Sequence, residues 1–311
     1  MMRNFVRLGT APLVTTAPVA HLVRQSFGTT TAPAAAAAPS PFTVPIFTSL
    51  TLSSPAPGVI RVALNRPHRL NALTRTAFTE IHEAFEWIDT SSTTRAVLIS
   101  GEGKHFCAGI DLETLGDLKR SIHDPSDLNA DAATRARALA RVIRQLQVEI
   151  NAPARCRLPV IVVSHGEALG AGLALLCAAD IRVAAGGGGI QVTEPRLGFA
   201  CDLGTLQRIT KQVASASWTM EMCLTARRVT VEEAFEKGFF SALHPTLAAA
   251  DAAALAIAVQ CAKLPPAAVE DTKRQLVLAY DGVRIADGLD LITLTNAAAL
   301  QGNQIGGKKI K

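Results

Sequence analysis

Strand-like and helix-like segments alternate along this chain up to about residue 245, and only helical patterns follow. Short runs rich in β-branched residues read as strands, while apolar residues at three- and four-residue spacing indicate amphipathic helices. This alternation predicts an α/β core, and the Ala-rich remainder predicts an α-helical C-terminal region. The predicted strands are 58–65, 95–100, 158–166, 180–185, 189–194 and 239–245, and the predicted helices are 74–89, 132–150, 230–238, 247–264 and a segment that begins at Pro266.

The start of the chain differs in composition from the rest. Residues 1–30 contain arginine, are rich in Ser and Thr and lack acids, and an Ala/Pro-rich stretch follows them. This composition is typical of a mitochondrial transit peptide followed by a linker, and a tail without function is the alternative. We therefore interpret 1–42 as transit peptide and linker, expect a location in the mitochondrial matrix, and divide the remainder into a core of 43–245 and a helical region of 246–311.

Charge and composition exclude several classes of protein. Three of the basic residues lie in the first forty positions with no acid beside them, so the net charge of +5 falls to +2 for the remainder. So small a net charge does not indicate the basic surface that binding of nucleic acid requires. The most apolar stretch, 158–180, contains His165 and Glu167, so we predict no membrane span. The six cysteines show no metal-binding spacing, so we predict free, buried thiols and no metal.

Two stretches share one design in which a strand is followed by glycine and a helix start. They are "GKHFCAGIDLETL" at 103–115 and "SHGEALGAGLAL" at 164–175. The first N–H groups of a helix have no partner within it, and glycine allows a ligand to approach the backbone closely. Two such N–H groups directed at one oxygen would stabilise negative charge on it. Each turn alone is also compatible with ordinary packing.

A third stretch, "TEPRLGFACDLGTLQR" at 193–208, places Glu194 and Asp202 among apolar residues that are interrupted by glycines. Acids in such a run can be solvated loop residues, or they can be a pair of proton-transfer groups. The neighbouring glycine turns favour the second interpretation.

These motifs resemble the crotonase, or enoyl-CoA hydratase/isomerase, family, and within it the Δ3,5-Δ2,4-dienoyl-CoA isomerases. The matching segments, spread from about 45 to 300, are "NRPHRLNALT", "FCAGIDL", "HGEALGAGLALLCAADIR" and "QVTEPRLGFACDLGTLQRITK". The resemblance implies a crotonase-like spiral of ββα units, a homotrimer or homohexamer built through the C-terminal helices, and an acyl-CoA thioester substrate. It also implies an isomerase that converts 3,5-dienoyl-CoA to 2,4-dienoyl-CoA during oxidation of unsaturated fatty acids. Coenzyme A would be part of the substrate, and no separate cofactor would be needed.

The resemblance also assigns roles to single residues. The backbone N–H groups of Ile110 and Ala171 would form the oxyanion hole, and Glu194 and Asp202 would be the two catalytic carboxylates. Glu194 would act near the α-carbon and Asp202 at the distal carbon, with the direction of proton transfer left open. The residues implied in substrate or CoA binding are Arg69, Ala108, Gly109, Asp111 and Lys273, the last of these at a neighbouring subunit's CoA.

Ala174 departs from the family pattern, which has an acid at this position. Hydration uses two glutamates, so the loss of one disfavours a hydratase. We also expect less raised pKa values for the two remaining acids than in relatives, and a lower pH optimum. Two alternatives stay open, namely a Δ3,Δ2-enoyl-CoA isomerase that uses Glu194 alone and a catalytically impaired assembly subunit. An RNA-binding member is disfavoured because the helix from Arg75 to Asp89 mixes basic and acidic residues.

Overall fold

The computed structural model describes residues 44–116, 131–301, 304–305 and 308–309. The chain from Val44 onward forms one compact unit. The predicted transit peptide and linker of 1–42 lie outside the described residues.

The centre of the fold is a six-stranded sheet with the order β1-β2-β3-β4-β6-β9. β1 and β2 form an antiparallel pair, and every later pairing in the sheet is parallel. Parallel strands need helical crossovers between them, which the alternating sequence provides. The strands are β1 Leu50–Ala56, β2 Val59–Leu64, β3 Ala96–Gly101, β4 Val160–Ser164, β6 Ile181–Ala185 and β9 Ala242–His244.

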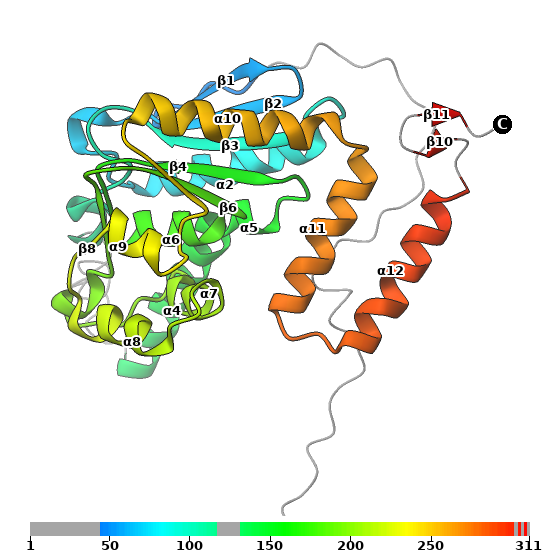
Figure 1. Cartoon of the computed structure of the whole chain (residues 1–311). Helices are drawn as coiled ribbons and strands as arrows, with labels where there is room; N and C mark the ends of the chain where they lie inside the picture. The colour runs from blue at the N-terminus through cyan, green and yellow to red at the C-terminus, as the bar shows by residue number, and fades with distance from the viewer. Residues whose placement is uncertain (1–43, 117–130, 302–303, 306–307, 310–311) are drawn as a thin grey trace, which may run out of the picture. The chain divides into compact units, whose positions relative to one another are not determined.

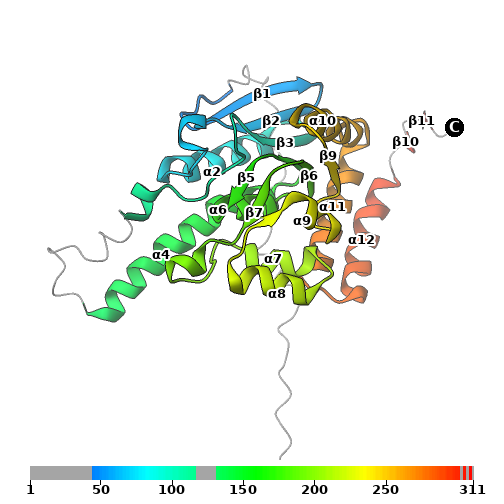
Figure 2. The ribbon, with the colours of Figure 1, turned by 60° about the vertical axis from the view of Figure 1, so that its left-hand side comes forward.

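A smaller three-stranded sheet carries the part of the fold that matters most for the site. β5 (Glu167–Leu169) pairs in parallel with β7 (Gly189–Gln191), which pairs antiparallel with β8 (Val229–Thr230). β5 contacts α6 (Ala171–Ala178), which follows it in the chain, as Figure 2 shows. Because β5 and β7 run in the same direction, their C-terminal ends meet at one edge of this sheet.

Helices cover the two faces of the central sheet. One face is covered by α10, which runs along the strands in Figure 1 and presents an alanine every fourth residue, Ala250, Ala254 and Ala258. Small side chains at one helical face let the helix lie close to the sheet. The helices with defined bounds are α2 Arg75–Thr90, α4 Ala132–Ile150, α5 Ala152–Arg155, α6, α7 Thr205–Gln212, α8 Ala216–Thr225, α9 Val231–Glu236, α10 Leu247–Lys263, α11 Pro266–Tyr280 and α12 Ile285–Ala299, with the short 3-10 turns η1 Pro67–Arg69 and η3 Glu194–Leu197.

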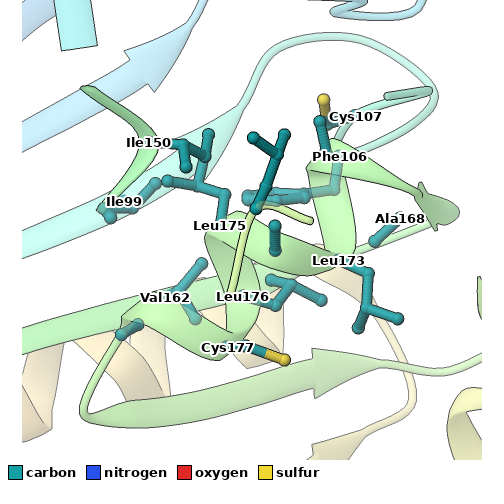
Figure 3. Close-up of a cluster of buried hydrophobic side chains, with 14 of the residues drawn as sticks. Ile99, Phe106, Cys107, Ile150, Val162, Ala168, Leu173, Leu175, Leu176 and Cys177 are labelled. Atoms are coloured by element: carbon teal, nitrogen blue, oxygen red, sulfur yellow. The ribbon is translucent and has the colours of Figure 1, made fainter. Parts of the chain in front are cut away.

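The alternation of side chains along each strand separates two hydrophobic clusters. On β3, Ala96 and Leu98 face α10, whereas Val97 and Ile99 belong to the larger cluster that includes α2 and α6. Both faces of the strand are buried, which explains the continuous apolar run in the sequence. Figure 3 shows α6 in the larger cluster, with Leu175 and Leu176 near Ile99 and Val162.

The C-terminal helices α11 and α12 contact one another, and β10 (Gln304–Ile305) pairs with β11 (Lys308–Lys309) after them. α10 packs on the central sheet, so the predicted division at 245 is not a break in packing. Whether 246–311 mediates assembly stays a prediction. Among the described residues no single helix is long and apolar enough to cross a membrane, and the one pair that would be, α10 with α11, is bent by 114°.

The structure confirms the long predicted helices and adds short elements that periodicity did not predict. β5, β8, α7 and α8 have too few residues for a pattern to distinguish them from loops. The helix start at Thr230 is present, because the Thr230 hydroxyl accepts a hydrogen bond from the Glu233 N–H (3.1 Å). The Glu233 side chain binds Arg227 and Trp218 instead of closing a reciprocal capping box.

Candidate active site

The two glycine turns lie against each other. The Cys107 N–H donates to Glu167 O (3.1 Å), and the Leu169 N–H donates to Cys107 O (3.0 Å). Gly109, with φ +96°, makes the contact possible, because a Cβ there would lie 2.8 Å from Leu169 O and 3.7 Å from Ala171 N. Only glycine allows this approach of backbone to backbone. The turn that precedes Ile110 is therefore held against the start of α6.

Asn71 holds the other flank of the first turn. This buried residue adopts φ 56°, in the left-handed region where Asn is enriched. Its Oδ1 accepts from the Arg66 N–H (2.9 Å), and its Nδ2 donates to the carbonyl oxygens of Glu102 (2.8 Å) and His105 (2.9 Å). The sequence motif around Asn71 does not by itself predict this role. The signal that could have found it is an Asn within a turn that directly follows a strand.

The N–H groups of Ile110 and Ala171 are free to bind a ligand. No acceptor within the described ranges takes either N–H. Ala171 is the first residue of α6, where backbone N–H groups have no partner in the helix, and the helix dipole adds positive potential. The Leu73 N–H donates to Gly109 O (2.7 Å), and the Asp111 N–H donates to Leu73 O (2.9 Å). The Ile110 N–H between them takes part in neither bond. The arrangement can stabilise an oxyanion.

Glu194 lies beside the second turn because of strand pairing. Gln191 at the end of β7 pairs with Leu169 at the end of β5, and the Gly170 N–H donates to Gln191 O (3.0 Å). A Cβ at Gly170 would lie 3.3 Å from Glu194 Oε1. The glutamate is buried, its Oε1 accepts a hydrogen bond from Cys201 Sγ (3.3 Å), and its Oε2 has no hydrogen-bond partner among the residues described. One carboxylate oxygen therefore remains available for a proton.

Asp202 follows the cysteine that contacts Glu194. Its backbone carbonyl accepts a hydrogen bond from Gln147 Nε2 of α4 (2.7 Å), which fixes the loop. α4 is itself joined to α2, since Arg75 pairs with the buried Glu149. Burial raises the pKa of the Asp202 carboxyl above its ordinary value. A carboxyl that keeps its proton to higher pH is suited to act as a general acid.

The residues predicted to contact CoA lie in different parts of the fold and differ in their exposure. Ala108 and Asp111 belong to the first turn, where Asp111 Oδ2 lies 3.3 Å from Arg66 Nη1, and Arg69 is exposed at the end of η1. Lys273 is buried, and its Nζ contacts Asp180 Oδ2 (2.7 Å) and Leu158 O (2.8 Å). This ammonium group joins α11 to the core, so a contact between Lys273 and CoA would have to replace or share that ion pair.

Ala174 lies on the buried side of the site. Every residue of α6 is buried, and Ala174 belongs to the larger hydrophobic cluster. An acid at this position would lose its hydration in apolar surroundings, a cost that alanine does not incur.

No cluster of metal-ligating side chains occurs in the part of the chain that the structure describes. The six cysteines are free, and Cys107, Cys156, Cys177 and Cys201 are buried.

Comparison with known proteins identifies the class to which this fold and site belong. The family described as "Enoyl-CoA hydratase/isomerase" matches residues 55–291. The chain belongs to the enoyl-CoA hydratase/isomerase family. An enoyl-CoA hydratase from Bacillus anthracis has the same fold, with a TM-score of 0.71 at 24% identity over 82% of this chain and 92% of that one. The family and the α/β fold predicted from the sequence are confirmed.

Named relatives are similar to this chain over most of its length. The human mitochondrial Δ3,5-Δ2,4-dienoyl-CoA isomerase is 36% identical over 255 residues, which is 82% of this chain and 76% of that protein. The peroxisomal enzyme of the same name from Arabidopsis thaliana is 36% identical over 78% of this chain and 85% of its own. A Thermobifida fusca protein assigned as an enoyl-CoA hydratase, solved with acetoacetyl-CoA, is 29% identical, with a TM-score of 0.67 over 81% of this chain and 95% of that one.

The close approach at Gly109 can be tested by substitution. Gly109→Ala places a Cβ 2.8 Å from Leu169 O at a positive φ, so we expect a loss of at least about 2 kcal/mol in the free energy of unfolding. Gly187→Ala is the matched control, because Gly187 has φ +80° and no atom within 4 Å of the added Cβ. The control should cost only about 1 kcal/mol. Equal losses in urea unfolding would show that steric contact between the turns is unimportant.

The raised pKa of Asp202 predicts a pH-dependent effect on stability. A carboxyl whose pKa is higher in the folded than in the unfolded state binds its proton more tightly when folded. Its ionisation, at pH values above the folded-state pKa, therefore opposes folding. Asp202→Asn removes this penalty. At pH 7 we expect the variant to unfold at the same or a higher temperature than the wild type. The advantage of the variant should shrink as pH falls through the raised folded pKa of Asp202 towards the unfolded carboxyl value of about 3.9, and should stay constant below that value. A variant less stable at pH 7 than at pH 3, relative to wild type, contradicts this.

Proposed function

We propose that this protein is an isomerase that converts 3,5-dienoyl-CoA to 2,4-dienoyl-CoA in the oxidation of unsaturated fatty acids. The observation that carries the proposal is the position of Glu194, buried beside the turn at Gly170 and Ala171 with one oxygen unpaired. Two relatives named Δ3,5-Δ2,4-dienoyl-CoA isomerase, at 36% identity, support the reaction and an acyl-CoA substrate. The presence of Asp202 in addition to Glu194 supports a reaction with two proton-transfer sites.

The first step is removal of a proton from the α-carbon. The thioester oxygen accepts hydrogen bonds from the N–H groups of Ile110 and Ala171, and these stabilise the negative charge that develops on it. Glu194 Oε2 takes the proton from C2, and the electrons of the broken C–H bond enter the conjugated system. The product of this step is an extended dienolate, with Glu194 protonated.

The second step places a proton at the far end of the conjugated system. Asp202 donates a proton to C6, and the electrons return from the thioester oxygen to form the 2,4-diene. One base cannot serve carbons that are four bonds apart, so the two acids have separate tasks. The raised pKa of Asp202 supports its role as the acid. Proton exchange with solvent then restores both carboxyl groups.

Assembly and location are part of the same proposal. Exposed apolar residues gather on the C-terminal helices, namely Leu276 and Tyr280 on α11 and Ile285, Leu289 and Leu294 on α12. Such surface supports self-association, and we propose a homotrimer or homohexamer. We propose the mitochondrial matrix on the composition of 1–42, and the peroxisomal relative makes the peroxisome the alternative.

The reaction can be followed directly in the ultraviolet, because a conjugated 2,4-dienoyl product absorbs strongly. We expect the wild type to convert a 3,5-dienoyl-CoA, and Glu194→Gln and Asp202→Asn each to lose roughly 10²–10⁴-fold in kcat. Glu236→Gln, which changes an exposed acid of α9, is the control and should keep full activity.

Three other results would contradict the proposal. Activity on a 3-enoyl-CoA that survives Asp202→Asn would indicate an isomerase with Glu194 as its single acid. Binding of CoA esters without turnover of either substrate would indicate an impaired assembly subunit. Full activity of Glu194→Gln would exclude the assigned base.

A further inference from the structure

Cys201 is a buried thiol that contacts the proposed base. Its side chain is 4% exposed, and its Sγ lies 3.3 Å from Glu194 Oε1. This sulfur is the hydrogen-bond partner of Oε1 within the described chain, while the buried Oε2 has none. The two oxygens of one carboxylate therefore have different surroundings.

The thiol acts as a donor rather than as a nucleophile. Burial, together with the nearby charge of Glu194, raises the pKa of the Cys201 thiol to about 12. It therefore keeps its proton at neutral pH, and thiolate chemistry is suppressed. An S–H group is a weak donor, and its strength increases when the acceptor is charged and the site is dry.

A buried carboxylate with one free oxygen needs a fixed orientation to be an efficient base. Glu194 begins the short turn η3, and its neighbours from Pro195 to Ala200 are exposed. Packing from that side is therefore limited. The contact with Cys201, whose own loop is held by Gln147 of α4 through Asp202 O, supplies a connection to the rigid core.

We propose that Cys201 is a positioning residue, whose S–H group holds Glu194 Oε1 so that Oε2 points to the substrate proton. This inference rests on the proposed function of Glu194 as the base. The thiol does not touch the substrate, so it should affect the rate of proton transfer and leave substrate binding unchanged. A cysteine with only a packing role would have no such selective effect.

Three variants separate these two roles. Cys201→Ala removes the donor and leaves a small side chain, whereas Cys201→Ser retains a donor. Cys223→Ala is the matched control, because Cys223 is a half-buried thiol of α8 close enough to Glu194 for its pKa to be affected by that charge. We expect Cys201→Ala to lower kcat about tenfold at unchanged KM, Cys201→Ser to recover to within about threefold of wild type, and Cys223→Ala to be normal.

Equal losses in Cys201→Ala and Cys201→Ser would overturn the inference, since retaining a donor would then have no value. Wild-type kcat in Cys201→Ala would overturn it as well. A rise in KM without a fall in kcat would show that the residue shapes the binding site instead.

A second measurement reports on the hydrogen bond without any turnover. The infrared S–H stretching band of Cys201 is obtained as the difference between wild type and Cys201→Ser. We expect this band to move to higher frequency in Glu194→Ala, because the acceptor is gone. An unmoved band overturns the inference even if the enzyme is active. A shifted band in a protein that does not convert dienoyl-CoA supports the contact while the proposed function fails.

Discussion

The site depends on the close approach of two backbone turns at glycine. Gly109 lies against Leu169 O, and Gly172 lies so close to Cys107 that a Cβ there would be 2.5 Å from Cys107 O. These contacts bring together N–H groups from segments about sixty residues apart in the sequence. Parallel pairing of β5 with β7 then adds Glu194 to the same place. A side chain at either glycine would push the two turns apart and so separate the two proposed oxyanion donors, Ile110 and Ala171, from each other.

The apolar core keeps this arrangement rigid. α6 is buried along its whole length, and Figure 3 shows its side chains among those of β3 and β4. A helix embedded in this way holds its first N–H groups in fixed directions, so little reorganisation is needed when charge develops on a bound oxygen. Low polarity around the site also strengthens each remaining electrostatic interaction. Because Ala174 is apolar, the proposed chemistry falls to Glu194 and Asp202 without a third acid from α6.

Much of this could be predicted from the sequence, and the limits have physical causes. The long helices and buried strands follow from periodicity, and Gly109 with the turn at 170–171 follows from the need for backbone access. Asn71 was missed because its hydrogen bonds join segments that only the fold brings together. The contact of Cys201 with Glu194 was missed for the same reason. Lys273 was predicted to contact the CoA of a neighbouring subunit, which stays a prediction, and the buried ion pair of its ammonium group is a contact that no local pattern shows.

The central claim is that two carboxyl groups act at opposite ends of one conjugated system. A single turnover of 3,5-dienoyl-CoA in D₂O, with deuterium located in the product by NMR, tests it most directly. The account predicts one deuterium at C6, because Asp202 exchanges its proton with solvent before it donates. Deuterium at C4 would indicate a shift by a single acid, and a C6 proton carried over from C2 of the substrate would contradict separate roles for Glu194 and Asp202.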